Sequence, residues 1–319
     1  MSEPERTEEG KPEGCAPSKC ATCPMRGSCS TAGAAAPDPD QLKINEKMAH
    51  IKHKLLVLSG KGGVGKSTVS AQLASTLALR GHNVGILDID ICGPSIPRML
   101  GCEGEDVHGT SAGWSPVYVK ENLGVMSIGF MLPSKDDAVI WRGPRKNGLI
   151  KQFLSDVVWG DIDYLIIDTP PGTSDEHISI VTMLKDGDKK PDGAIVVTTP
   201  QEVSLMAVRK EINFCKKTDI PVIGVVENMS SFVCPDCGAQ HPLFAPSTGG
   251  AKKMCEDTNT ELLGQIPMDP RVCVCCDEGK NVMESMEGTS VAKALSVIVE
   301  KLEGLKTTET ETKDEPKTQ

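Results

Sequence analysis

Short runs of consecutive apolar residues alternate with amphipathic stretches from residue 54 onward. The apolar runs predict buried strands, because a strand covered on both faces needs no polar alternation; they are 55–58, 84–87, 164–167, 194–197 and 222–226. Helical periodicity predicts helices over 41–53, 66–79, 145–156, 174–184, 203–216 and 289–303. This alternation predicts an α/β fold with a mainly parallel sheet and helices on both of its faces.

The two ends of the chain have a different composition. Residues 1–40 are rich in Pro, Gly, Ala, Glu and Cys and have almost no large apolar side chains. Such a segment buries too little surface to fold alone, so we expect a flexible arm. We expect residues 41–303 to form the folded domain and residues 304–319, rich in Thr, Glu and Lys, to be a disordered tail.

Composition narrows the possible partners and compartments. The 319 residues carry a net charge of −10 and only 3% aromatic residues, which argues against a nucleic-acid partner. No apolar run reaches the ~18–20 residues that span a bilayer, and the N-terminus lacks the features of a signal peptide. We therefore expect no membrane partner and a location in the cytoplasm, with the nucleus as a second possibility.

In a reducing compartment the 13 cysteines are not expected to form disulfides, and their clusters suggest metal binding.

The most specific motif follows the first predicted strand. It fits the phosphate-binding pattern G-x-x-x-x-G-K-S and reads Gly60-Lys61-Gly62-Gly63-Val64-Gly65-Lys66-Ser67-Thr68. The glycines allow backbone N–H groups to surround phosphate oxygens, and the helix that starts here adds its positive end. Lys66 would contact the β- and γ-phosphates of ATP, and Ser67 would ligate Mg²⁺.

Acidic residues follow two other predicted strands. Asp168 ends the run 163–168, at the edge where open α/β sheets bind ligands, and is expected to hold Mg²⁺. The next loop, 169–173, can sense the γ-phosphate. Asp88 and Asp90 follow the second strand, and either carboxylate could orient the attacking water, although Asp88 could also be a cap or turn residue.

Together these motifs resemble the deviant-Walker-A P-loop ATPases, which include MinD, ParA and the nitrogenase iron protein. By this resemblance Lys61 reaches the nucleotide of a partner subunit, and Asp90 orients the water. Asn228 and the turn 267–269, with Asp269, would lie near the adenine. The segments 88–97, 141–144, 168–176 and 234–237 narrow the resemblance to the Mrp/Nbp subgroup, the scaffold ATPases of cytosolic iron–sulfur cluster assembly. This resemblance covers about residues 15–300.

The arm contains a dense set of four cysteines: Cys15, Cys20, Cys23 and Cys29. Four thiolates on a flexible segment suit a 4Fe–4S cluster, although zinc accepts the same ligands. The Mrp/Nbp subgroup carries a cysteine motif in such an extension. The family has a longer gap before its C-x-x-C, so Cys15 departs from the pattern while the other three keep it.

A second pair, Cys234 and Cys237, follows the last apolar run. One interpretation is a zinc ribbon completed by His241 or Cys255. The other is a symmetric dimer in which two cysteines from each chain give four ligands. The family resemblance implies the dimer, with a 4Fe–4S cluster bridged between subunits, and the same dimer would bring Lys61 to the partner's nucleotide.

Several remaining residues have no assigned role from the sequence. Cys255 and Cys276 resemble further family cysteines but are equally compatible with semi-buried thiols. Cys273 and Cys275 have no family counterpart. His177 is expected to be a hydrogen-bonded surface residue rather than a ligand.

The resemblance implies a slow ATPase that assembles 4Fe–4S clusters and transfers them to cytosolic and nuclear apoproteins. The implied partners are a second copy or a related scaffold ATPase in a heterotetramer, an electron donor, and downstream iron–sulfur targeting proteins. Two alternatives stay open: a positioning ATPase of the ParA or MinD kind, and an electron-transfer ATPase like the nitrogenase iron protein.

Overall fold

The computed structural model describes residues 38–132, 141, 143–185, 190–244 and 248–305. The chain divides into two units, Met1–Asp38 and Pro39–Gln319, and nearly everything described belongs to the second. The predicted arm, with Cys15, Cys20, Cys23 and Cys29, lies outside the described residues. So does the predicted tail, apart from its first two residues.

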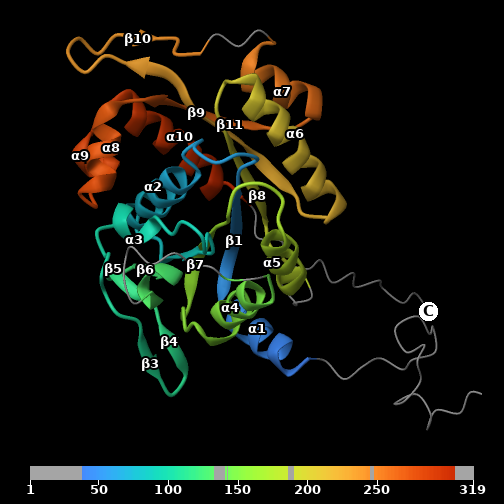
Figure 1. Ribbon diagram of the computed structural model, residues 1–319. Coiled ribbons are helices and arrows are strands. Elements are labelled where there is room, and N and C mark those ends of the chain that lie inside the picture. The colour runs from blue at the N-terminus through green and yellow to red at the C-terminus, as the bar shows by residue number, and fades with distance from the viewer. Residues whose placement is uncertain (1–37, 133–140, 142, 186–189, 245–247, 306–319) are drawn as a thin grey trace, which may run out of the picture. The chain divides into compact units, whose positions relative to one another are not determined.

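A nine-stranded sheet forms the centre of the second unit (Figure 1). Its order is β10-β9-β8-β1-β7-β2-β6-β5, and β11 also pairs with β9. All pairings are parallel except β10 with β9 and β5 with β6, which lie at the two ends of this order. The strands are β1 Ile51–Leu58, β2 Val84–Asp88, β5 Val117–Lys120, β6 Leu123–Ser127, β7 Ile162–Asp168, β8 Gly193–Thr198, β9 Val222–Val233, β10 Gln240–His241 and β11 Leu262–Met268; β3 His108–Thr110 and β4 Gly113–Ser115 form a separate hairpin.

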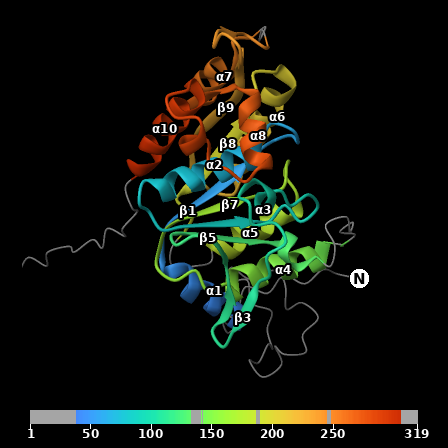
Figure 2. The same ribbon diagram turned by 90° about the vertical axis from the view of Figure 1, so that its left-hand side faces the viewer.

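Helices cover both faces of this sheet, as predicted (Figures 1 and 2). One face packs on α1, α4, α5, α6 and α7, and the other on α2, α3, α8, α9 and α10. The helices are α1 Pro39–Ala49, α2 Lys66–Leu79, α3 Ile96–Met99, α4 Gly143–Asp156, α5 Asp175–Lys185, α6 Glu202–Lys217, α7 Gly250–Thr258, α8 Pro270–Asp277, α9 Val282–Ser285 and α10 Ser290–Glu303, and a 3-10 turn spans Ile128–Met131.

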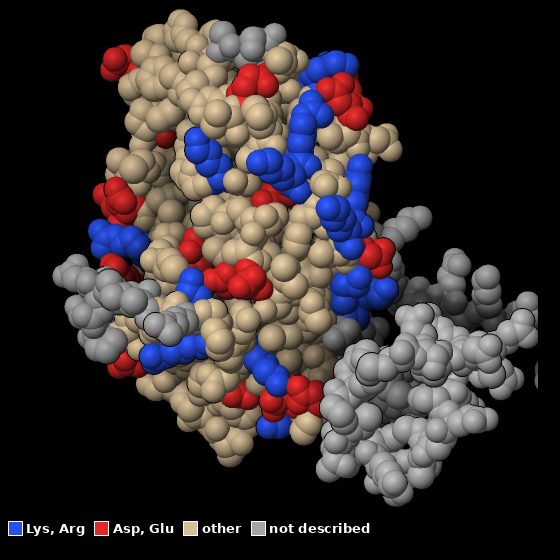
Figure 3. All heavy atoms as spheres, turned by 45° about the vertical axis from the view of Figure 1, so that its right-hand side comes forward, with Lys and Arg blue, Asp and Glu red and all other residues tan. Residues whose placement is uncertain are grey.

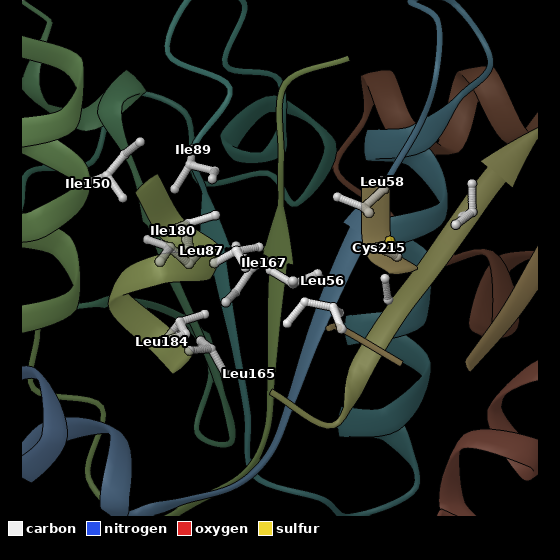
Figure 4. Close-up of a cluster of buried hydrophobic side chains, with 14 of the residues drawn as sticks. Leu56, Leu58, Leu87, Ile89, Ile150, Leu165, Ile167, Ile180, Leu184 and Cys215 are labelled. Carbon is white, nitrogen blue, oxygen red and sulfur yellow. The ribbon is translucent and has the colours of Figure 1, made fainter. Parts of the chain in front are cut away.

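Alternate residues of each central strand supply the two cores. In β1, Leu56 and Leu58 face the helices α4, α5 and α6, while Leu55 and Val57 face α2 and α10. Figure 4 shows the first of these cores, in which side chains of β1, β2 and β7 meet those of α4 and α5. Continuous apolar runs therefore indicated burial on both faces correctly.

The predicted helix over 41–53 is wrong in its last part. Helix α1 ends at Ala49 and β1 already begins at Ile51, so His53 and Lys54 belong to the strand. Both are buried, and Asp192 satisfies them: its carboxylate accepts from the Lys54 amide at 2.7 Å and lies 3.0 Å from His53 Nδ1. Because Asp192 is distant in the sequence, the polar start of this strand did not look like a strand.

Strand β9 is longer than predicted and carries a bend. It continues past Val226 to Val233 because its second half pairs with β11 and β10. Within it, Met229 has a φ of 56°, which is uncommon for a residue with a side chain. The strand therefore carries Asn228 and ends next to Cys234, with the bend between them.

The charged side chains on the face shown in Figure 3 are of mixed sign, with Lys and Arg standing among Asp and Glu. Within the residues that the structure describes, no helix combines the length and apolar character needed to cross a bilayer.

Candidate functional site

The glycine-rich loop joins β1 to α2 at the carboxyl end of the sheet. Gly63 and Gly65 have φ values of 80° and 82°, which glycine adopts without a steric penalty. A Cβ at Gly65 would collide with the side-chain amide of Asn228, whose Nδ2 donates to the Val64 carbonyl at 2.9 Å. The loop thus needs glycine both for its conformation and for the close approach of β9.

A cavity of about 190 Å³ opens over this loop. Backbone and side chains of the loop form one wall, and Asp90, Ser95 and Pro171 contribute from other segments. Lys61 is exposed at this cavity and makes no ion pair within the described part of the chain. Backbone N–H groups at the start of a helix, together with two lysines, give this cavity the chemistry of an anion site.

Asp168 organises the floor of the site. It ends β7, where its neighbours in register are Val57 of β1 and Asp88 of β2. Its fully buried carboxylate accepts from Lys66 Nζ at 2.7 Å and from Ser67 Oγ at 2.6 Å through one oxygen. The other oxygen accepts from Ser70 Oγ at 2.6 Å. The Walker lysine and the predicted magnesium ligands therefore meet at one point.

The structure distinguishes between the two acids that follow β2. Asp88 is fully buried, and its carboxyl accepts from Ser127 Oγ and from the Asp90 amide, both at 3.0 Å. Burial, with a further contribution from the charge of Asp168, raises the pKa of Asp88 to about 8. Asp90 is half-buried and lines the cavity, and burial also raises its pKa. Of these two acids, only Asp90 is placed to meet a molecule in the cavity.

A second, larger cavity of about 390 Å³ adjoins the loop and shares Gly65 and Thr68 with it. Asn228 and Asp269 line this cavity, as does the whole turn 267–269. Asp269 caps α8, and its carboxylate holds the Arg271 guanidinium at 2.6 Å, which lowers the pKa of Asp269. The residues expected near the adenine therefore share one mainly apolar groove beside the phosphate loop.

Cys234 and Cys237 lie in the turn between β9 and β10. The turn is closed by bonds from the Cys234 amide to the Ala239 carbonyl and from the Gly238 amide to the Cys234 carbonyl, both 2.9 Å long. Cys237 is exposed and Cys234 half-buried. Backbone N–H groups of Cys237 and Asp236 lower the pKa of the Cys234 thiol, which favours the thiolate that binds metals.

The zinc ribbon within one chain does not form in the part that the structure describes. That part includes Cys234, Cys237, His241 and Cys255, yet it contains no group of three or more His, Cys, Asp or Glu side chains able to hold a metal ion. Cys255 is instead buried in α7, where burial raises its pKa.

Comparison with known proteins identifies the family of this chain. Residues 50–303 match the ParA family model described as "NUBPL iron-transfer P-loop NTPase". The chain belongs to this family. The resemblance to the Mrp/Nbp subgroup is thereby confirmed, and this iron-transfer P-loop NTPase is an ATPase.

One solved structure agrees with this assignment, and two others share the fold. The nucleotide-binding protein of Archaeoglobus fulgidus, in complex with ADP and with cobalt found in it, is 38% identical, with a TM-score of 0.66 over 77% of this chain and 93% of its own. The cell division ATPase MinD of Pyrococcus furiosus is 23% identical, with a TM-score of 0.55 over 80% of this chain and 100% of its own. MinD of Aquifex aeolicus is 20% identical, with a TM-score of 0.56 over 80% of this chain and 98% of its own. The two MinD structures support the fold alone.

Other cysteines of this P-loop NTPase differ in their surroundings. Cys276 is buried in α8 beside Gln72, and burial raises its pKa to about 11. Cys275 is also buried, whereas Cys273 is exposed. As a buried thiol, Cys276 is better suited to packing than to binding a metal.

The sequence missed several residues that shape the site. Ser70 lies one helical turn after Lys66 and binds Asp168, a spacing that could have been recognised. Lys146 on α4 bridges Glu176 at 2.9 Å and Cys92 at 3.2 Å, and so connects the segments that follow β7 and β2. The expectation that His177 lies on the surface is wrong: its ring is 1% exposed and lies behind the loop that follows Asp168.

Proposed function

We propose that this ATPase is a scaffold that assembles 4Fe–4S clusters and transfers them to cytosolic and nuclear apoproteins. The observation that supports this proposal best is the thiol pair at the end of β9, formed by the half-buried Cys234 and the exposed Cys237. A cubane cluster takes four thiolates, and within the described residues of one chain no third ligand joins the pair. A second copy related by a two-fold axis would present the same pair and complete the set.

A dimer of this kind also explains Lys61. The side chain is exposed at the phosphate cavity and unpaired in the described chain, as expected for a cation that serves the partner's nucleotide. A cation supplied by a partner accelerates related phosphoryl transfers by ~10³–10⁵. The dimer is a homodimer or part of a heterotetramer with a related scaffold ATPase. An electron donor and downstream targeting proteins are the further partners, and the cytoplasm, possibly with the nucleus, is the proposed location.

The residues that the sequence predicts for nucleotide binding have proposed roles in ATP hydrolysis. The loop 60–68 would surround the phosphates with its N–H groups, and Lys66 would turn from Asp168 toward them. Ser67 and Asp168 offer the hard oxygen donors that Mg²⁺ prefers, so the residues present fit this ion. When bound, Mg²⁺ would neutralise charge on the phosphates. Asp90 would orient the attacking water, and the groove with Asn228 and Asp269 would hold the base.

The four cysteines of the arm are proposed to hold a second 4Fe–4S cluster. This part of the proposal depends on their spacing alone, since Cys15, Cys20, Cys23 and Cys29 lie outside the described residues. Cys20, Cys23 and Cys29 keep the family's spacing, and Cys15 is the fourth ligand in this assignment.

Anaerobic reconstitution of serine variants tests the bridging site. We expect Cys234→Ser and Cys237→Ser each to lose the iron and sulfide of one cluster per dimer, about four iron atoms, while the arm keeps its own. Cys273→Ser is the matched control, because this thiol is also exposed but belongs to α8 and not to the turn between β9 and β10. The Cys234→Ser and Cys237→Ser variants should both unfold at the wild-type temperature. Full iron content per dimer in both would contradict the assignment.

A transfer assay separates a scaffold from an electron-transfer ATPase. Protein loaded with radioactive iron is mixed with an apo acceptor, and both the label and the redox state of the acceptor are followed. A scaffold moves the label, whereas reduction of the acceptor without labelled iron would contradict cluster transfer.

A further inference from the structure

One buried imidazole holds both ends of the loop that follows β7. Thr169 begins this loop directly after Asp168, and Ser174 ends it at the start of α5. The His177 ring lies between them, with Nε2 3.1 Å from Thr169 Oγ1. On its other side, Nδ1 lies 3.1 Å from Ser174 Oγ and 3.2 Å from the Ser174 amide nitrogen. A single side chain therefore closes a loop of six residues.

The hydrogen-bond pattern defines the protonation state of this ring. The Thr169 hydroxyl donates to a carbonyl, that of Val57 at 2.8 Å or that of Pro170 at 3.3 Å. Toward His177 it can then only accept, so Nε2 carries the proton. Nδ1 must keep its lone pair, because the Ser174 amide can only donate. His177 is thus a neutral imidazole of the Nε2–H form.

The surroundings of the ring favour this neutral form. Burial lowers the pKa of His177 to about 4. The charge of Lys66, at the start of α2, also lowers this pKa, whereas the charge of Glu176, on the same helix as His177, raises it. On α6, the uncharged Phe214 packs edge-on against the ring, with centroids 6.1 Å apart. A second proton on Nδ1 would face the N–H of Ser174 and break the contact.

The loop that His177 closes belongs to the phosphate cavity. Pro171 lines that cavity, and the Gly172 amide donates to the Ser59 carbonyl at 2.7 Å, just before the glycine-rich loop. His177 itself does not line the cavity. It can therefore influence a bound phosphate only through the loop that it holds.

We propose that His177 is a positioning residue for ATP hydrolysis, which fixes the loop 169–174 against the phosphate cavity by binding Thr169 and Ser174 as a neutral imidazole. The inference depends on the ATPase activity of the family and not on the cluster that the protein carries. The loop that can sense the γ-phosphate then has a defined position before ATP binds. Losing the ring should lower the hydrolysis rate more than the affinity for ATP, because the groove and the glycine-rich loop do not contact it.

Three substitutions of His177 test its two hydrogen-bond contacts separately and together. His177→Gln can place an amide N–H where Nε2 lies and keep the bond to Thr169. His177→Asn can place an acceptor where Nδ1 lies and keep the bond to Ser174. His177→Ala loses both. We expect Ala to lower kcat by about tenfold, with the KM for ATP changed by less than about twofold, and Gln and Asn to recover part of kcat.

The assays use the full chain at matched iron content, with thermal unfolding as a check on folding. His108→Asn is the control, because His108 is an exposed histidine in β3; it should keep wild-type kinetics. An Ala variant with kcat within about twofold of wild type would overturn the proposal. So would an effect on KM alone.

A measurement on the wild-type protein does not depend on whether a variant folds. Nitrogen-15 spectra of the histidine ring should show the neutral Nε2–H form of His177 throughout about pH 6 to 8. A Nδ1–H form, or titration near the ordinary value of about 6.5, would overturn the proposal independently of the kinetics.

Discussion

Asp88 offers the sharpest test of the electrostatics of the site. Its carboxyl is fully buried at the end of β2, and burial together with the charge of Asp168 raises its pKa to about 8. In the unfolded chain an Asp titrates near ~3.9. Between these two values folding takes up one proton, so the free energy of unfolding falls as pH rises through this window and levels off above it.

The cost of keeping Asp88 protonated can be worked out at neutral pH. At pH 7 the solution is about three pH units above the unfolded pKa, and each unit costs about 1.4 kcal/mol, giving about 4 kcal/mol. Asp88→Asn removes this cost. Its oxygen can still accept from the Asp90 amide, and its nitrogen can donate to Ser127 Oγ, which reverses the direction of that bond. We expect the variant without nucleotide to be more stable at pH 7 by up to about 4 kcal/mol, and the gain to shrink toward pH 4.

Urea unfolding followed by tryptophan fluorescence at a series of pH values measures this gain. The control is Asp163→Asn: although partial burial opposes it, the hydrogen bond from Lys52 lowers the pKa of Asp163. That variant should be less stable than wild type at pH 7, with a difference that shrinks in acid. The reasoning about Asp88 is wrong if Asp88→Asn destabilises the chain at pH 7, or if its gain does not grow with pH.

Three further substitutions test the phosphate loop and the last helix, one of them as a control. Gly65→Ala adds a side chain at a φ of 82°, and this side chain collides with Asn228. The Kd for a fluorescent ATP analogue should therefore rise at least about tenfold. The free energy of unfolding should fall by ~1–3 kcal/mol. Gly81→Ala, at a φ of 92° with no atom near its Cβ, should cost ~1 kcal/mol and leave Kd unchanged; equal Kd values for both would contradict the steric argument. Thr289→Ala removes the cap that accepts from the Ala292 amide at 3.3 Å and should lower the free energy of unfolding by about 1 kcal/mol, which a wild-type melting temperature would refute.

Local patterns in the sequence were enough to predict the centre of the fold and the phosphate loop. Leu56 and Leu58 belong to an apolar run that only a strand buried on both faces explains. The glycines at 60, 63 and 65 indicate where the backbone must turn and approach another segment. Asp168 could be placed because the carboxyl ends of parallel strands meet at one edge of the sheet.

What the sequence did not show depends on contacts between distant segments. His53 was assigned to a helix because its partner, Asp192, is 139 residues away. His177 was placed on the surface because nothing in its local sequence indicates that Thr169 and Ser174 satisfy both ring nitrogens inside the fold. The second half of β9 has a polar sequence that resembles a loop, and it is a strand because it pairs with β10 and β11.

The path of β9 limits how a bound nucleotide could influence the metal that Cys234 and Cys237 are proposed to hold. Cys234, in the turn between β9 and β10, lies six positions after Asn228 at the groove beside the phosphate loop, which at ~3.3 Å per residue amounts to at most about 20 Å. Salt largely screens solvent-exposed charges that lie more than about 8–10 Å apart, so at this separation the field of a lost phosphate has little effect on an iron–thiolate bond. The direct route that the fold offers is mechanical, a displacement carried along the strand and through the bend at Met229.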